Sequence, residues 1–343
     1  MNILAPIDNV SEVKLYSVLG VDEIYCGYVP SNWKKTYNNK VKNWTNKDLQ
    51  LSLNRREIGF ANITLEEDMI AIVKNAHSLG MKVFVTVNAP SYPQNTYEFI
   101  INYIASLVEY KVDGLIVSDI GLIRKIKEKF NIKVMLSTCN QVSSVEGVKF
   151  LKEVGVDRIV FPRHVDLKDI ARITKEVPDM EYECFLLEGK CVYDDGNCNI
   201  LHSCGSFCSE KWITRYYDEN FEEVEQESQQ MFRKNEADYQ RYTTPYINTD
   251  RYENGWRNNG CGVCALPYIM ENTNISSIKI AGRGIDECQK IKNISILKKA
   301  IKMAEGGSNR TDIMSYMKKE VQPYPELCDD GYRCYYPEAK KLD

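Results

Sequence analysis

Six cysteines fall into two tight groups along this chain of 343 residues. The sequence holds them as Cys191, Cys198, Cys204 and Cys208 in the first group and Cys261 and Cys264 in the second. Short loops that carry several thiols bring deprotonated sulfurs to one point, as zinc and iron–sulfur clusters require. Four of the six are therefore the expected metal ligands, and three interpretations compete: a closed zinc site, a [4Fe-4S] cluster, or buried and inert thiols.

The spacing of these cysteines favours a cluster over zinc. Zinc sites commonly use two Cys-x2-Cys pairs, and here Cys261 and Cys264 form the one such pair. Irregular spacings drawn from distant loops are typical of a cluster, and Gly196 gives the first loop a flexible turn. Radical-SAM enzymes use Cys-x3-Cys-x2-Cys, but Lys211 stands three residues after Cys208, so that class is disfavoured.

A second set of candidates consists of polar side chains that follow short apolar runs. Arg163, Lys279 and Arg283 suit a carboxylate or phosphate, because cationic donors form charge-assisted hydrogen bonds with anions. Glu183 or Asp119 suits proton transfer. We expect a catalytic group of Glu183, Asp119 and Arg163, and a substrate-binding group of Tyr25, Asn88, Gln141, Lys279 and Arg283.

Eight short apolar runs alternate with helical patterns and supply the elements that must position these residues. The predicted strands span residues 2–7, 23–27, 82–88, 114–119, 133–138, 158–162, 181–187 and 277–281. Continuous apolar runs are typical of strands covered on both faces. The chain is therefore predicted to be an α/β protein with a (β/α)8 barrel; a doubly wound open sheet is the alternative, but it does not naturally use eight units. All the polar candidates would then surround one mouth, at the carboxyl ends of the strands.

A long insertion interrupts this pattern between the seventh and eighth strands. We expect residues 1–190 to hold seven strands, 191–267 a Cys-rich insertion or lid, 268–305 the barrel closure and 306–343 a C-terminal tail. Within the insertion, residues 212–259 are rich in Glu, Gln, Arg and Tyr, which indicates either a solvated helical segment or a lid. Cys328 and Cys334 in the tail are six positions apart, a poor metal signal by itself.

Charge and composition limit the kinds of partner and the cellular compartment that we expect for this chain. The formal net charge is −4, so no global field recruits nucleic acid, although local basic patches remain compatible with RNA. The first residues lack the basic region of a signal peptide, and no run reaches the roughly 18 to 20 apolar residues of a membrane span. We therefore expect a cytoplasmic protein with reduced cysteines; a secreted, disulfide-linked protein is the alternative.

Several motifs together resemble a known family. In chain order they are Leu4-Ala5-Pro6, Val21-Asp22-Glu23-Ile24-Tyr25-Cys26-Gly27, Val117-Ser118-Asp119, Ser137-Thr138-Cys139-Asn140-Gln141, Phe161-Pro162-Arg163, Glu183-Cys184-Phe185, the cysteines, and Ile278-Lys279-Ile280-Ala281-Gly282-Arg283. The chain resembles the thirty-second family of unassigned peptidases, labelled collagenase-like. The family includes proteins for oxygen-independent ubiquinone hydroxylation, which carry [4Fe-4S] clusters, and proteins that hydroxylate tRNA and rRNA pyrimidines with prephenate as the implied oxygen source.

The resemblance implies ligands and a function. Cys191, Cys198 and Cys204 match three cluster ligands, with Cys208 as an alternative to Cys204 and with Cys261 or Cys264 as the fourth. Ala281 departs from the pattern, because many relatives have Glu there. The leading hypothesis is an iron–sulfur enzyme for oxygen-independent hydroxylation of an aromatic or nucleobase substrate, a small molecule or RNA, with a prephenate-like oxygen donor and a reductant or protein partner. The alternatives are a peptidase or other hydrolase, and a non-catalytic electron-transfer or scaffold subunit of a heterodimer.

Overall fold

A computed structural model of the chain describes residues 1–33, 35, 53–56, 61–189, 196, 215, 217–224, 260–320, 326–329 and 334–341. Eight parallel strands form a closed barrel in the order β1 to β8, so β8 pairs with β1. The strands are β1 (Asn2–Pro6), β2 (Glu23–Cys26), β3 (Lys82–Val87), β4 (Gly114–Val117), β5 (Lys133–Leu136), β6 (Arg158–Val160), β7 (Glu181–Leu187) and β8 (Ile275–Ile280). The predicted (β/α)8 barrel is confirmed.

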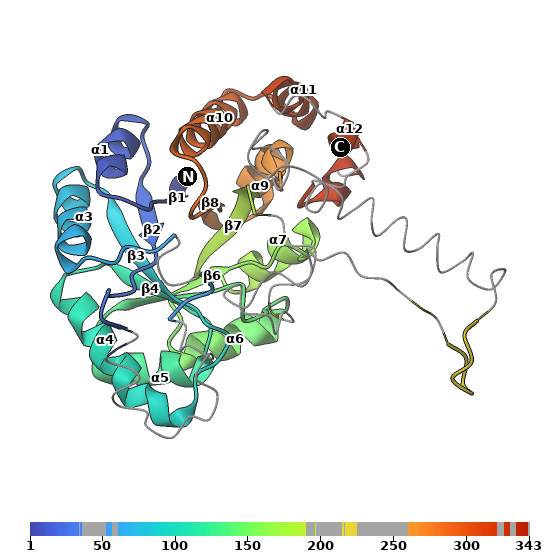
Figure 1. Cartoon of the computed structure of the whole chain (residues 1–343). Coiled ribbons are helices and arrows are strands. Elements are labelled where there is room, and N and C mark those ends of the chain that lie inside the picture. The colour runs from blue at the N-terminus through green and yellow to red at the C-terminus, as the bar shows by residue number, and fades with distance from the viewer. Residues whose placement is uncertain are drawn as a thin grey trace.

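A helix follows each strand and covers the outside of the barrel (Figure 1). These helices are α1 (Ser11–Val18), α3 (Glu66–Ser78), α4 (Tyr97–Glu109), α5 (Ile120–Lys129), α6 (Val145–Val154), α7 (Leu167–Glu176), α9 (Leu266–Asn272) and α10 (Glu287–Glu305). Short 3-10 helices, η1 (Gln94–Thr96) and η5 (Val263–Ala265), precede α4 and α9. After α10 come α11 (Arg310–Glu320), α12 (Glu326–Asp329) and η6 (Pro337–Lys341).

Local sequence explains where the helices begin and end. Ser144 caps α6 by accepting a hydrogen bond from the backbone N–H of Gly147 at 3.1 Å, and Asp166 and Asp286 cap α7 and α10 in the same manner. At the other end of α6, Gly155 adopts φ +105°, a left-handed conformation that glycine reaches without steric cost. These signals fix the connections that return the chain to the next strand.

The strands are buried on both sides, as their apolar runs indicate. All four residues of β2 and of β4 are buried, and in β7 all but the first are. Inside the barrel, residues two apart on one strand share the interior face, which places Glu23 below Tyr25 and Glu183 below Phe185. No described helix is long and apolar enough to cross a membrane.

Candidate functional site

A buried ion network occupies the amino-terminal end of the barrel interior. Arg158, the first residue of β6, donates to both carboxylate oxygens of Glu23 on β2, at 2.6 and 2.8 Å. The same guanidinium donates to Glu181 at 2.9 Å and to Glu183 at 3.1 Å, and Ser277 donates to Glu23 at 3.1 Å. Burial disfavours the charge of Arg158, but the surrounding carboxylates raise its pKa above the ordinary value. Arg158 is therefore a fixed cation that ties together three strands.

The network continues upward through Lys279 of β8. Its Nζ atom donates to Glu183 at 3.0 Å and lies 4.4 Å from the centre of the Tyr25 ring and 5.7 Å from that of Phe185. Burial lowers the pKa of Lys279, while the Glu183 carboxylate opposes that shift. Two predicted site residues of opposite charge, Glu183 and Lys279, are thus brought into direct contact beneath an aromatic layer.

Above this layer, Arg283 lies just beyond the end of β8. Its side chain is 7% exposed, and Nη1 donates to Thr86 at 2.9 Å. Burial lowers the pKa of Arg283 to about 10, and nearby Arg56 contributes in the same direction, so the guanidinium stays charged at neutral pH. Close approach requires Gly27, because a Cβ atom there would lie 2.2 Å from Nη1 of Arg283. The mouth is therefore built around a buried cation.

Arg163 adds a further cation to the same mouth. Its guanidinium carbon lies 3.9 Å from the centre of the Phe185 ring and 6.0 Å from that of Tyr335, so both rings are within cation–π distance. Tyr335 comes from the C-terminal tail, and its hydroxyl donates to the backbone carbonyl of Glu188. Burial lowers the pKa of Arg56, and the charges of Arg55 and Arg163 contribute in the same direction.

Asp119 serves as the N-cap of α5 in the structure. One carboxylate oxygen accepts from the Leu122 backbone N–H at 2.8 Å and from the Tyr97 hydroxyl at 2.5 Å. The other accepts from the backbone N–H of Tyr92 at 3.0 Å. Both oxygens are therefore occupied by helix-capping and packing interactions, while the proposed part of Asp119 in proton transfer stays a prediction.

Asn88 directly follows β3, and Gln141 lies in the loop after β5. The side-chain amide of Asn88 donates to the Ser137 hydroxyl at 3.1 Å, while its side-chain oxygen Oδ1 is buried without a hydrogen-bond partner among the described residues. That oxygen is available to a substrate donor. Gln141 is exposed and packs against Gly196, where a Cβ atom would lie 2.2 Å from the Gln141 side chain. Since Gly196 stands between Cys191 and Cys198 in the sequence, this contact brings part of the first cysteine loop to the mouth.

The expected metal ligands are described in part. Cys261 pairs with Leu187 in an antiparallel bridge at the end of β7, and Cys264 lies in η5 and is 9% exposed. The remaining candidates, which lie outside the described residues, are Cys191, Cys198, Cys204 and Cys208. Most of the Tyr-rich segment 212–259 also lies outside them. Thiols at the carboxyl end of β7 suit a soft metal near the mouth, but no three described Cys, His, Asp or Glu side chains are grouped to hold one.

Some of these residues escaped the sequence analysis. Arg158 and Glu23 stand at the starts of strands, and charged residues that alternate through buried strands were the available signal, as in Glu181 and Glu183 of β7. Arg56 and Tyr335 had no such signal, because each lies outside the barrel strands and reaches the mouth only through tertiary packing.

The profile of Peptidase family U32 matches residues 8–343. The chain belongs to this family. The U32 chain is 29% identical to "tRNA hydroxylation protein P" of Haemophilus influenzae over 57% of its own length and 37% of the relative's. It is 33% identical to "23S rRNA 5-hydroxycytidine C2501 synthase" of Escherichia coli over 40% of its own length and 20% of the relative's.

A third relative matches the U32 chain along nearly its whole length. This uncharacterized protease of Methanocaldococcus jannaschii is 25% identical over 99% of the U32 chain and 74% of the relative. The RNA hydroxylation proteins are longer, and the U32 chain matches about a fifth to two fifths of their length. The resemblance seen in the sequence motifs is thereby confirmed at the level of the family.

Proposed function

We propose that this U32 chain is an iron–sulfur enzyme that takes part in the oxygen-independent hydroxylation of an RNA base. The observation that carries the proposal is the pair of cations at the mouth, buried Arg283 and half-buried Arg163, in a chain whose relatives include RNA hydroxylation proteins. A cytoplasmic setting with reduced thiols belongs to the same proposal.

The mouth suits an anionic ligand with an aromatic portion. Arg283 and Arg163 present charged donors to a carboxylate or phosphate, and their fixed positions reduce the entropy lost on binding. Tyr25 and Phe185 supply ring surfaces beneath those donors. An RNA phosphate and a prephenate-like carboxylate share this chemistry, so the arginines serve the substrate or the oxygen donor.

Hydroxylation without molecular oxygen requires a second substrate that supplies the oxygen atom. Hydroxylation replaces a C–H bond of the base with C–OH, and a donor that exchanges its hydroxyl for hydrogen supplies the oxygen without molecular oxygen. Lys279, held against Glu183 at 3.0 Å, is placed to hold or pass a proton near the bound anion. A [4Fe-4S] cluster on four of the six candidate cysteines would relay electrons from the base to the donor, so the exchange consumes no net electrons and a reductant or protein partner would serve only to set the resting state of the cluster.

The test uses the full chain, purified without oxygen. Iron, sulfide and a broad absorbance near about 400 nm are expected. Nucleosides from the RNA of a strain that lacks the gene should lack a hydroxylated base, which the wild-type gene restores when oxygen is excluded. Arg283→Met should fail to restore it, whereas Arg172→Met, which changes an exposed arginine of α7, should restore it fully. A chain without iron, or an unchanged nucleoside profile, would overturn the proposal.

A further inference from the structure

Cysteines from two distant parts of the chain meet beside β7. Cys261 and Cys334 pair as neighbours in a parallel backbone bridge, and the N–H of Tyr335 donates to the carbonyl of Cys261 at 2.8 Å. The Cys264 and Cys334 thiols are within hydrogen-bonding contact. The tail therefore runs alongside the Cys-x2-Cys segment, with the Cys334 thiol of the tail in contact with the Cys264 thiol.

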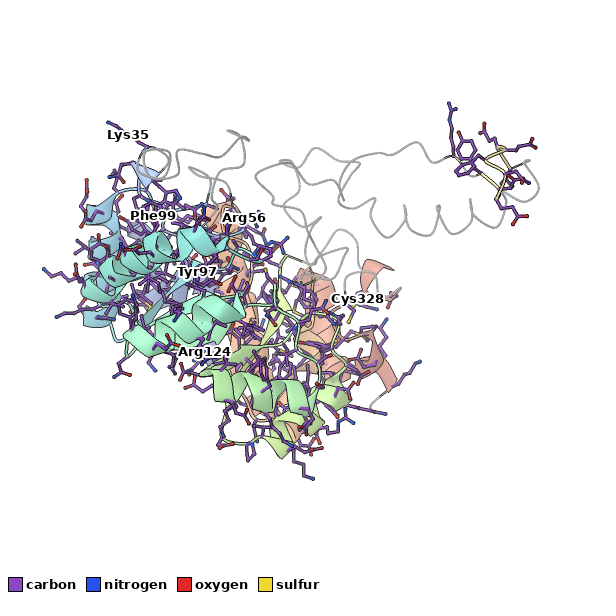
Figure 2. The ribbon with its side chains drawn as sticks, turned by 90° about the horizontal axis from the view of Figure 1, so that it is seen from below. Lys35, Arg56, Tyr97, Phe99, Arg124 and Cys328 are labelled. Carbon is purple, nitrogen blue, oxygen red and sulfur yellow. The ribbon has the colours of Figure 1, made fainter. Side chains whose placement is uncertain are left out.

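Two more thiols border that contact. Cys261 and Cys328 are near enough to Cys264 that both contribute to raising the pKa of its thiol, after the contact with Cys334 and burial. Cys328 lies at the end of α12, where Lys340 donates to its backbone carbonyl at 2.9 Å and fixes the turn. Figure 2 places Cys328 beside the C-terminal helices, away from α4, which carries Tyr97 and Phe99.

We propose that Cys261, Cys264, Cys328 and Cys334 bind one zinc ion as a closed structural site. Four thiolates match the tetrahedral preference of zinc, and the Cys261–Cys264 spacing is that of a zinc knuckle. No three of these thiols stand at ligand positions around one point in the described residues, so Cys261 and Cys328 must turn toward the Cys264–Cys334 contact. Such closure is expected, because metal ligands are seldom fully arranged before the metal binds.

The position of this site gives it a structural role at the mouth. It would fasten the segment that carries Tyr335, whose ring lies 6.0 Å from the Arg163 guanidinium. It would also leave Cys191, Cys198, Cys204 and Cys208 as a separate set of four for the cluster. The zinc site rests on the proposed function in one respect, because Cys261 and Cys264 are also candidate cluster ligands: the assignment requires that the cluster use the first cysteine group alone, and loss of iron together with zinc would contradict it.

The metal content of anaerobically purified protein tests the site. The wild-type chain should contain one zinc in addition to any iron, and Cys328→Ser and Cys334→Ser should each lose the zinc and keep the iron. Cys288→Ser, which changes an exposed cysteine of α10, should retain both metals. Limited proteolysis should then cut the tail of the zinc-free variants sooner than that of the wild type.

Cobalt substitution keeps the test decisive if the serine variants fail to fold. Cobalt in the wild-type chain should give the sulfur-to-cobalt charge-transfer intensity of four thiolates. Absence of zinc from the wild type, zinc retained in both tail variants, or iron lost from them would overturn the assignment. A mass lower by two hydrogens, traced to a Cys264–Cys334 disulfide in the anaerobic protein, would do the same.

Discussion

Replacing Arg158 with methionine should destabilise the barrel strongly. The side chain is 2% exposed and is the shared partner of Glu23 and Glu183, which are 1% and 0% exposed. Methionine preserves most of the volume but leaves both carboxylates without their guanidinium. Removing one partner of a buried ion pair costs about 3–5 kcal/mol.

That cost converts into a measurable shift in the melting temperature. At about 2.1 cal/mol/K per residue, the unfolding entropy of this chain is roughly 0.7 kcal/mol/K, so the melting temperature should fall by about 4–7 °C. Thermal unfolding followed by circular dichroism measures the fall.

Two further variants test whether the destabilisation comes from the buried ion pairs of Arg158 or from the loss of any arginine. Arg172 is exposed and pairs with Asp169 at 3.0 Å, so Arg172→Met should change the melting temperature by less than about 1 °C. Adding Glu23→Gln to Arg158→Met should recover part of the loss, because it removes one of the stranded charges. A fall for Arg158→Met no larger than that of Arg172→Met would refute the reasoning.

Three other outcomes are expected. Arg283→Met should weaken anion binding by about 10- to 150-fold, since a hydrogen bond to a charged group contributes about 1.5–3 kcal/mol. The melting temperature should stay unchanged or rise, because the substitution removes a buried charge. Calorimetry that shows weaker binding at unchanged stability separates a lost anion contact from misfolding. Burial raises the pKa of Cys26 to about 12, so at pH 8 only about one Cys26 thiol in ten thousand is ionised. Alkylation at pH 8 should therefore spare Cys26 and modify exposed Cys288, which peptide mass spectrometry measures. Cys198→Ser should abolish cluster loading and make residues 212–259 more sensitive to protease, with only a modest loss of far-UV helicity. If the metal-free variant resists protease as well as the wild type does, side-chain packing rather than the metal holds the segment.

The sequence predicted the barrel because its signals are local. Continuous apolar runs marked the strands, and the helix that follows β5 ends where a glycine, Gly155, adopts a left-handed conformation at low cost. The predicted strands differ from the observed ones by at most two residues at either end: β7 coincides with its prediction, whereas β4 ends at Val117 rather than at Asp119. The carboxylate of Asp119 instead caps the following helix, because it accepts a hydrogen bond from the backbone N–H of Leu122 in the first turn.

The site divides in the same way. The sequence alone named Lys279, Glu183 and Arg283 as candidates, because polar residues at the carboxyl ends of barrel strands face one mouth. The structure joins Lys279 to Glu183, but Glu183 is the third residue of β7 and lies lower, in the ion network with Arg158. The cysteines stay predicted ligands, named because their residue type suits few kinds of chemistry.

Only the tertiary structure decided which distant residues join that site. Arg158 gathers carboxylates from β2 and β7 because register places the strand starts at one level, and no local pattern encodes that meeting. Tyr335 and Cys334 reach the barrel from the tail because the chain pairs its backbone with Cys261, 73 positions earlier in the sequence. Local sequence specifies the elements through backbone geometry and apolar periodicity, whereas contacts between segments far apart depend on how all eight strands close around one core.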